Sequence, residues 1–368
     1  MAAKSAMGGA PKVAAHPTRF WHRLADGRVQ CDACPRECKL HEGQHGFCLV
    51  RARQDDTIVL TAYGRSSGFC IDPIEKKPLH HFLPGTSALS FGTAGCNLGC
   101  RFCQNWDIST SRTWASLAEV ASPAAIAETA ERHGCRSVAF TYNDPVVFLE
   151  YAVDVAAACH ERGIRTVAVT AGYVKSDARL ELFGAMDAAN VDLKALDDGF
   201  YRRFAIGRLA PVLETLEGVA TLGRTWLEVT TLVIPGLNDG DAELDALSRW
   251  LADHLGPDVP LHVTAFHPDF RMLDRPPTPT ATLTRARAIA LANGLRYVYT
   301  GNVHDPDGQA TRCHECGHVL VGRDGYAISA WGLDGGGRCA DCGERLPGEF
   351  EAQPGRWGSR RKPVRIDG

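Results

Sequence analysis

The sequence predicts an α/β protein with a parallel sheet and a cysteine-rich segment on each side of that sheet. Two observations predict this class. Strand-like apolar runs alternate with helix-like segments through the middle of the chain, and eleven of the 14 cysteines fall into three groups. A chain of 368 residues, 45% of them hydrophobic, can also bury a sizeable core without disulfide bonds.

The charge balance and the hydropathy exclude several classes of protein. Lys and Arg number 40 against 43 Asp and Glu, so no overall field attracts nucleic acid or a membrane surface. No run of about 18 apolar residues predicts a membrane span, and the N-terminus has no apolar signal segment. We therefore expect a cytoplasmic protein without a membrane partner, in which reduced cysteine clusters bind metal.

Five regions are predicted along the chain. We expect a disordered tail over 1–20, a cysteine-rich metal-binding segment over 21–86, the α/β domain over 87–301, a metal-binding module over 302–350 and a basic tail over 351–368. The last region is Arg-rich and has little to bury, which favours a solvated tail over a specific binding arm.

The α/β domain is predicted from seven strand-like runs. These are 89–93, 137–142, 165–170, 189–193, 227–234, 261–266 and 295–299. Between them lie helix-like segments such as 241–255, in which leucines recur every three or four residues. Glycines that follow the helix-like segments are expected to end them: Gly134, Gly163, Gly223, Gly256 and Gly294.

This alternation predicts a parallel sheet of about six β-α units, with its chemistry at the carboxyl ends of the strands. Both a doubly wound open sheet and an incomplete barrel are compatible with six units. No Gly-x-Gly-x-x-Gly motif follows the first strand, which weighs against a dinucleotide-binding fold.

The central triple, Cys96, Cys100 and Cys103, follows the first predicted strand of this domain. Three thiolates suit three irons of a cubane cluster and leave the fourth iron open to a small chelating ligand. A zinc site completed by a distant histidine is the alternative, but structural zinc usually shows two separated cysteine pairs.

With an aromatic residue just before its last cysteine, the triple resembles that of the radical SAM superfamily. The resemblance implies a [4Fe-4S] cluster with S-adenosylmethionine (SAM) on its open iron. Reductive cleavage of SAM would give a 5′-deoxyadenosyl radical that abstracts hydrogen from a substrate. It also implies an incomplete (βα)6 TIM-like barrel over 87–301 and an electron donor of the flavodoxin or ferredoxin kind.

Further segments are similar to those of the AmmeMemoRadiSam-system radical SAM enzymes, relatives of pyruvate formate-lyase activating enzymes. These segments are 72–82 (DPIEKKPLHHF), 103–106 (CQNW), 141–145 (TYNDP), 192–194 (DLK) and 235–239 (PGLND). The likeness covers 31–347 and implies Memo-like and AMMECR-like partner proteins, whereas it assigns no substrate.

The resemblance also implies residues that contact SAM. Phe102 is expected to stack on the adenine, with core packing as the alternative. Asn143 and Asp144 are expected to accept hydrogen bonds from the methionine ammonium, with capping of a helix as the alternative. No catalytic residue is assigned beyond the cluster ligands.

Three more residues belong to this set of implied contacts. Asp192 and Lys194 alternate with apolar neighbours, so they point to one face of a strand and contact SAM or substrate, or else form a buried ion pair. His267 follows the sixth strand and is expected to contact the ribose or carboxylate of SAM. A histidine at the strand end with no contact to SAM is an equal alternative.

Two quartets of cysteines flank the α/β domain. The C-terminal quartet, Cys313, Cys316, Cys339 and Cys342, consists of two Cys-x-x-Cys pairs 22 residues apart and predicts a zinc ribbon. The N-terminal quartet, Cys31, Cys34, Cys38 and Cys48, fits either zinc or a second iron-sulfur cluster. A cluster there could pass electrons to the central one.

A function of another class is compatible with the quartets alone. A non-catalytic, zinc-stabilised adaptor could bind RNA or protein through its ribbon and basic tail. It gives no reason for three cysteines at the catalytic end of a sheet. We therefore expect no nucleic-acid partner, and the radical SAM enzyme is the leading hypothesis.

Overall fold

The computed structural model describes residues 16–111 and 119–366. Its centre is a nine-stranded sheet of order β16-β15-β14-β13-β12-β11-β9-β8-β20. Seven of these strands are parallel: β9 (Ser87–Phe91), β11 (Ser137–Phe140), β12 (Arg165–Thr170), β13 (Ala188–Asp192), β14 (Trp226–Val233), β15 (Leu261–Ala265) and β16 (Val298–Gly301). The predicted α/β class is confirmed, and each of the seven predicted strands is present.

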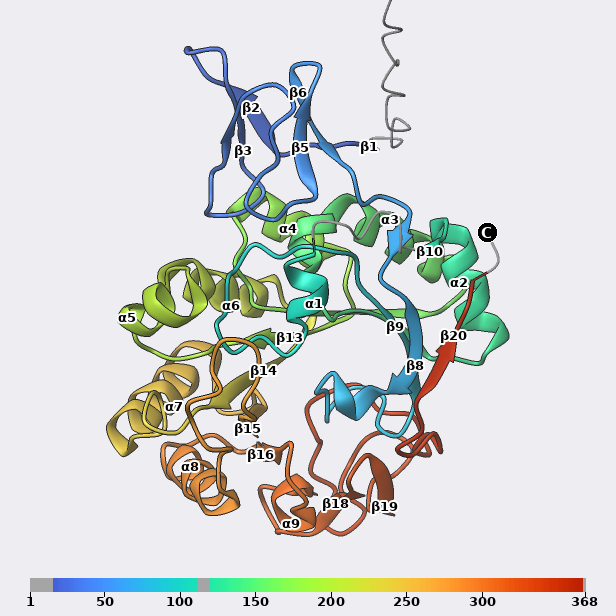
Figure 1. Ribbon diagram of the computed structural model, residues 1–368. Coiled ribbons are helices and arrows are strands. Elements are labelled where there is room, and N and C mark those ends of the chain that lie inside the picture. The colour runs from blue at the N-terminus through green and yellow to red at the C-terminus, as the bar shows by residue number, and fades with distance from the viewer. Residues whose placement is uncertain (1–15, 112–118, 367–368) are drawn as a thin grey trace, which may run out of the picture.

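Helices connect the parallel strands and lie around the outside of them (Figure 1). They are α2 (Pro123–Arg132), α3 (Leu149–His160), α4 (Ser176–Gly184), α6 (Ala210–Leu222), α7 (Asp241–Leu255) and α8 (Thr280–Ala292). The recurring leucines explain how α7 packs. Leu244, Leu247 and Leu251 are buried, so they form the apolar face of the helix.

The order of the parallel strands follows their order in the chain without a reversal. A doubly wound sheet reverses its strand order at a switch point, so this sheet is wound in one direction only. Short helical segments occupy the connections: η1 (Ile74–Lys76), α1 (Trp106–Ser109), η3 (Pro145–Phe148), α5 (Asp198–Phe200) and the π-helical turn η4 (Tyr201–Ala205).

The N-terminal segment forms two small antiparallel sheets beside α3 and α4 (Figure 1). One contains β1 (His16–Pro17), β6 (Thr57–Leu60) and β5 (Arg51–Gln54), and the other contains β2 (Trp21–Arg23), β3 (Val29–Cys31) and β4 (Lys39–Leu40). A further pair joins β7 (Arg65–Ser66) to β10 (Glu119–Val120). Because β1 pairs with β6, the predicted disordered tail over 1–20 is wrong for 16–20; the rest of that tail lies outside the described residues.

The C-terminal module contains α9 (Pro306–Gln309) and the sheet of β17 (Thr311–Arg312), β18 (Val319–Asp324) and β19 (Ala327–Trp331). The chain then returns to the central sheet, where β20 (Lys362–Val364) pairs antiparallel with β8 (Phe69–Pro73). The predicted solvated tail over 351–368 is therefore wrong for this stretch. The backbone of β20 pairs with the edge strand β8 and so covers it. Such pairing uses backbone groups, so it does not require apolar side chains.

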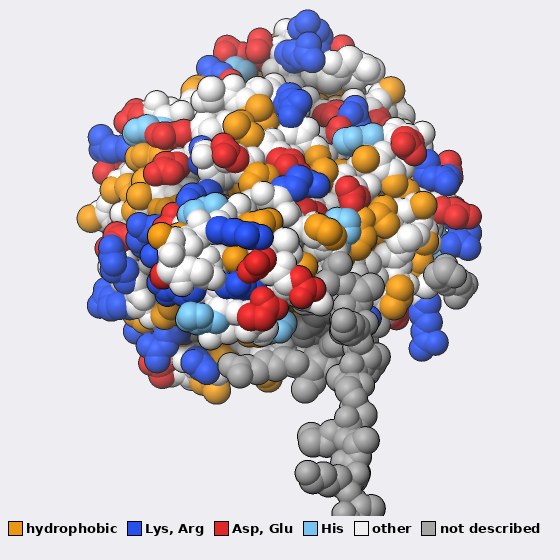
Figure 2. Space-filling view, turned by 90° about the horizontal axis from the view of Figure 1, so that it is seen from above, with side chains coloured by type: hydrophobic (Ala, Val, Ile, Leu, Met, Phe, Trp, Pro, Cys, Tyr) orange, Lys and Arg blue, Asp and Glu red, His pale blue; other side chains and the backbone are white. Residues whose placement is uncertain are grey.

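The surface carries both signs of charge. Figure 2 shows Lys and Arg side chains interspersed with Asp and Glu over one face of the molecule, consistent with the balanced composition. Among the described residues, none of the helices has the length and apolar character needed to cross a membrane.

Candidate active site and metal centres

A cavity of about 630 Å³ lies at the carboxyl ends of the parallel strands. Residues at or just past the ends of six strands line it: Asn143, Thr170, Asp192, Leu232, Thr264 and Gly301. All three cysteines of the central triple also line it, from the loop after β9. The cysteines and the strand-end polar groups therefore share one cavity. It lies at the carboxyl ends of the strands, where β-α proteins place their active sites.

The loop that carries the central triple is fixed by backbone hydrogen bonds to the turn η4. Gly99 donates to the carbonyl of Ala205 at 2.9 Å, and Arg101 donates to the carbonyl of Phe204 at 2.8 Å. The loop is thus held in place from a segment far along the chain.

The sulfurs of the central triple are spread too far apart to form a single-ion group among the described residues. Within the described part of the chain they do not form a group whose ligand atoms all lie within 4.8 Å, unlike the C-terminal quartet. One zinc ion would hold thiolates about 3.8 Å apart, given Zn–S bonds of about 2.3 Å. Each thiolate of a cubane binds a different iron, so a wider separation is required.

The surroundings of Cys96 and Cys100 disfavour the thiolate form of both side chains. Burial raises the pKa of Cys96 well above its usual value and that of Cys100 to about 11. A thiolate in such surroundings is stabilised by coordination. The separation of the sulfurs and the cavity that they line therefore fit a cubane cluster.

Asn143 holds the turn that leads into the triple. Its Oδ1 accepts from the N–H of Thr93 at 3.0 Å, and its Nδ2 donates to the carbonyls of Ala94 at 3.2 Å and Gly95 at 2.9 Å. A Cβ on Gly92 would lie 2.5 Å from Oδ1 of Asn143, so this fit requires glycine. The amide is thus bonded to the loop, while Asn143 also lines the cavity. Its predicted contact with SAM stays a prediction.

Asp144 is committed in a similar way. Its Oδ1 accepts from Val146 N–H at 3.0 Å and from Thr170 Oγ1 at 2.9 Å, while its Oδ2 accepts from Ala171 N–H at 2.9 Å. The cap that was the alternative to this prediction is present, because Asp144 caps η3. Asp144 also lines the cavity, and its contact with SAM stays a prediction. Burial raises the pKa of this carboxyl.

Asp192 and Lys194 form an ion pair in the wall of the cavity. Lys194 Nζ lies 2.8 Å from Asp192 Oδ2, and both side chains line the cavity. Burial opposes the ammonium charge, but the Asp192 carboxylate outweighs it and raises the pKa of Lys194 above its usual range. Phe102 is buried, packs 5.9 Å from the Phe200 ring and also faces the cavity.

His267 does not join these residues. It is exposed just past the end of β15 and is not among the described residues that line the cavity. The structure therefore gives no support to the predicted contact of His267 with SAM. A position after a strand end can face outward, which sequence alone does not reveal.

A buried lysine in segment 72–82 was not predicted from the sequence. Lys77 lines the cavity and donates from Nζ to Asp72 Oδ2 at 3.0 Å, and Tyr142 OH donates to the same oxygen at 2.9 Å. Burial lowers the pKa of Lys77 to about 8. Spacing gave one signal, because Asp72 precedes Lys76 and Lys77 by four and five residues.

The inner end of the cavity carries a buried polar network that the sequence also did not reveal. Glu228 accepts from the N–H groups of His80 at 2.9 Å and His81 at 2.7 Å, and from His262 Nε2 at 2.6 Å. His80 and His262 line the cavity, and His80 Nδ1 has no hydrogen-bond partner among the described residues. This end of the cavity therefore offers polar atoms to a bound molecule.

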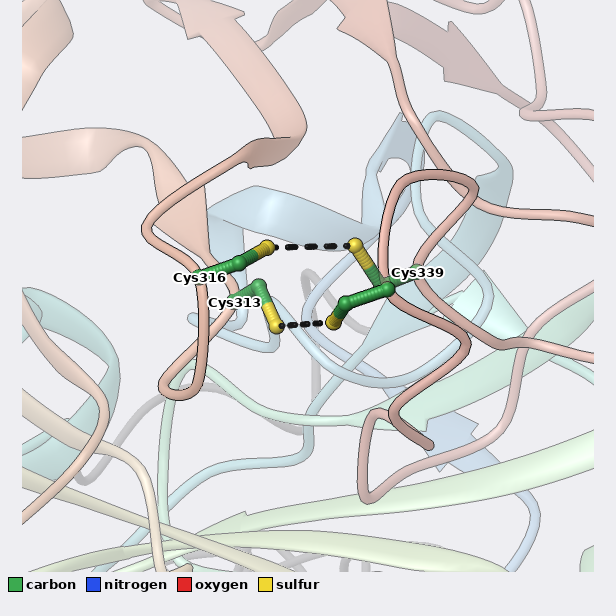
Figure 3. Close-up of side chains that lie close together, drawn as sticks. Cys313, Cys316 and Cys339 are labelled. Carbon is green, nitrogen blue, oxygen red and sulfur yellow. Dashed lines mark hydrogen bonds between the residues drawn. The ribbon is translucent and has the colours of Figure 1, made fainter.

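The C-terminal quartet forms a compact metal-binding group (Figure 3). Sγ of Cys313 lies 3.5 Å from Sγ of Cys342, and Sγ of Cys316 lies 3.7 Å from Sγ of Cys339. These separations fit four thiolates on one tetrahedral ion. The predicted grouping of these cysteines is confirmed.

The N-terminal quartet surrounds a different, small cavity of about 20 Å³. Cys31 and Cys48 are buried, and burial raises the pKa of Cys31 to about 11. All four side chains line this cavity, so the predicted N-terminal set also comes together.

Comparison with known proteins gives a family match and one relative of nearly full length. The profile of the Radical SAM superfamily matches residues 91–247. The chain is 39% identical over 328 residues to the uncharacterized protein MJ0808 of Methanocaldococcus jannaschii, covering 89% of this chain and 97% of that protein.

Relatives of named activity match over shorter stretches. The chain is 29% identical to the benzylsuccinate synthase activating enzyme of Thauera aromatica over 37% of this chain and 41% of that enzyme. It is 24% identical to the pyruvate formate-lyase-activating enzyme of Clostridium pasteurianum over 45% of this chain and 69% of that enzyme. A solved radical SAM methyltransferase from Sphaerobacter thermophilus has a TM-score of 0.45 at 16% identity, covering 79% of this chain and 77% of that one.

Proposed function

The chain belongs to the radical SAM superfamily, and from that premise we propose that it is an enzyme that cleaves SAM reductively. When bound, the [4Fe-4S] cluster and SAM would supply a 5′-deoxyadenosyl radical that takes hydrogen from a substrate. One observation carries the proposal: three spread cysteine sulfurs and the strand-end ion pair line the same cavity.

The residues of this chain have separate tasks in the proposed enzyme. Cys96, Cys100 and Cys103 hold the cluster. Asp192 and Lys194 offer a carboxylate and an ammonium to the charged groups of SAM, while Phe102 offers an aromatic face next to the last cysteine.

The finer parts of the fold belong to the same proposal. Seven parallel strands wound in one direction, with helices outside them, support a partial (βα)6 TIM-like barrel. The C-terminal quartet would hold zinc and keep a ribbon-like module folded. Since the relatives include activating enzymes, a partner protein is a candidate substrate, and a flavodoxin- or ferredoxin-like protein is the proposed electron donor.

Memo-like and AMMECR-like partners and a cytoplasmic location remain expectations from the family resemblance. The zinc-stabilised adaptor gains no observation in its favour, because it leaves the large cavity and its cysteines unexplained. It predicts zinc at every cysteine group and salt-sensitive binding to nucleic acid.

Anaerobic reconstitution with iron and sulfide, followed by dithionite and SAM, tests the proposal. The wild-type chain should release 5′-deoxyadenosine and methionine. A variant with Cys96→Ala, Cys100→Ala and Cys103→Ala should release only background amounts. Equal release from both chains, or none from either with a cluster bound, would contradict the proposed function.

A further inference from the structure

The N-terminal quartet differs from the C-terminal quartet in how its sulfurs are placed. In residues 16–111 and 119–366, the C-terminal quartet meets the 4.8 Å separation of a single-ion site, whereas the N-terminal quartet forms no such group. The N-terminal cysteines instead surround a cavity, as the central triple does. A multi-iron cluster requires sulfurs farther apart than those of a single-ion site, because each thiolate binds its own iron.

The walls of this small cavity suit a negatively charged cluster. Arg51 lines it with a buried guanidinium, held by Glu150 Oε2 at 2.5 Å and by the carbonyl of Val147 at 3.2 Å. Phe47 donates from its N–H to Cys38 Sγ at 3.4 Å. Cationic neighbours and N–H groups directed at thiolate sulfur stabilise the charge of iron-sulfur clusters and adjust their potentials.

The N-terminal quartet is also in direct contact with the loop of the central triple. Asn97 lines the small cavity and directly follows Cys96 in the chain. Arg36 Nε donates to the carbonyl of Asn97 at 2.8 Å. A Cβ on Gly95 would lie 1.8 Å from the carbonyl oxygen of Cys48, so the two backbones touch.

The two sites are therefore neighbours, since consecutive Cα atoms are about 3.8 Å apart. A zinc ion at this position would have no redox chemistry. An iron-sulfur cluster would be redox-active beside the central site. From the spread sulfurs, the charged walls and this contact, we propose that the N-terminal quartet holds a [4Fe-4S] cluster and not zinc.

The test uses a variant without the central triple and measures the metal that the rest of the chain binds. The variant with Cys96→Ala, Cys100→Ala and Cys103→Ala is purified and reconstituted without oxygen, and its metal and sulfide contents are measured. We expect about four irons and about four sulfides per chain, with about one zinc. Mössbauer spectroscopy should show a [4Fe-4S] cluster, and dithionite should generate its EPR signal.

A matched variant assigns that iron to the N-terminal quartet. Replacing Cys31, Cys34, Cys38 and Cys48 by alanine in the same background should abolish the iron and leave the zinc. If the second set does not fold, the Mössbauer spectrum of the first variant still decides. About two zincs and no iron in the first variant would overturn the proposal. This result does not depend on SAM cleavage, so failure of the proposed function and failure of this inference give different results.

Discussion

Arg323 on β18 donates from Nη2 to the backbone carbonyl of His80 at 2.7 Å. The same guanidinium donates from Nη1 to the carbonyl of Gln309 at 3.0 Å and to Thr311 Oγ1 at 2.9 Å. Arg323 is buried, and His80 lies at the inner end of the large cavity. The C-terminal module is thereby joined to the wall of the candidate active site.

Removal of metal from the C-terminal quartet should therefore destabilise more than the module itself. We expect Cys316→Ser to lose about one zinc per chain and to lower the Tm by about 5–10 °C, because a few kcal/mol of folding free energy depend on the metal. Cys316 is exposed, so the substitution itself costs little packing. Zinc analysis and calorimetry measure both effects.

The buried Cys159 provides the control for that experiment. Cys159→Ala in α3 should keep the zinc at its full content while changing the Tm through packing alone. Full zinc content in Cys316→Ser would show that zinc binding does not depend on the quartet.

Glu75 should give the folding stability a pH dependence. Burial raises the pKa of this carboxyl to about 7 from an ordinary value of 4.5, so between these pH values the folded chain holds more protons than the unfolded chain. Stability should therefore fall as pH rises through this window, by on the order of 3 kcal/mol. Glu75→Gln should remove that loss, as seen in urea unfolding at pH 4.5 and pH 8.

An exposed glutamate provides the comparison. Glu214→Gln on α6 should leave the pH dependence of the wild-type chain unchanged. If the unfolding free energies of Glu75→Gln and the wild-type chain run parallel from pH 4.5 to pH 8, folding does not raise the pKa of Glu75.

The ion pair in the cavity wall should affect SAM affinity without affecting the cluster. We expect Lys194→Met and Asp192→Asn each to raise the Kd for SAM about tenfold or more, because each change removes a charge that faces the cavity. Iron content should stay at the wild-type value. His267→Ala is the matched variant and should bind SAM normally, since His267 lies outside the cavity lining. A tenfold loss of affinity in His267→Ala would restore the role expected from the sequence.

The sequence was sufficient for the parts of the fold that depend on local pattern. The leucine spacing of 241–255 and the glycine at 256 place α7 with its observed ends. Cysteine spacing likewise identified three groups that the structure brings together. Local spacing limits which side chains can meet, so spacing alone was enough to predict α7 and the cysteine groups.

Contacts between distant segments could not be predicted in this way. Arg323 and His80 are separated by 243 residues, and neither stands in a metal-ligand or catalytic pattern. The pairing of β20 with β8 uses backbone groups that every sequence carries. The commitment of the Asn143 amide depends on the turn at 92–95 packing against it, which pattern and resemblance do not specify.

Asn143 gives the last prediction, because the family resemblance implies a contact with SAM and the structure shows its amide bonded to the loop before Cys96. In the structure its amide bonds hold the residues just before Cys96, so Asn143→Ala should loosen that loop and cost about 3 kcal/mol of stability. The central site should then take up less iron, and SAM binding should fall only in proportion to that iron.

Asn293→Ala is the control, since Asn293 donates from Nδ2 to Asp245 Oδ1 at 3.0 Å and Ser248 Oγ at 2.8 Å, outside the cavity lining. This control should lose stability and keep its iron. Iron analysis with SAM titration separates the roles: full iron with lost SAM affinity in Asn143→Ala would make Asn143 a direct ligand of SAM.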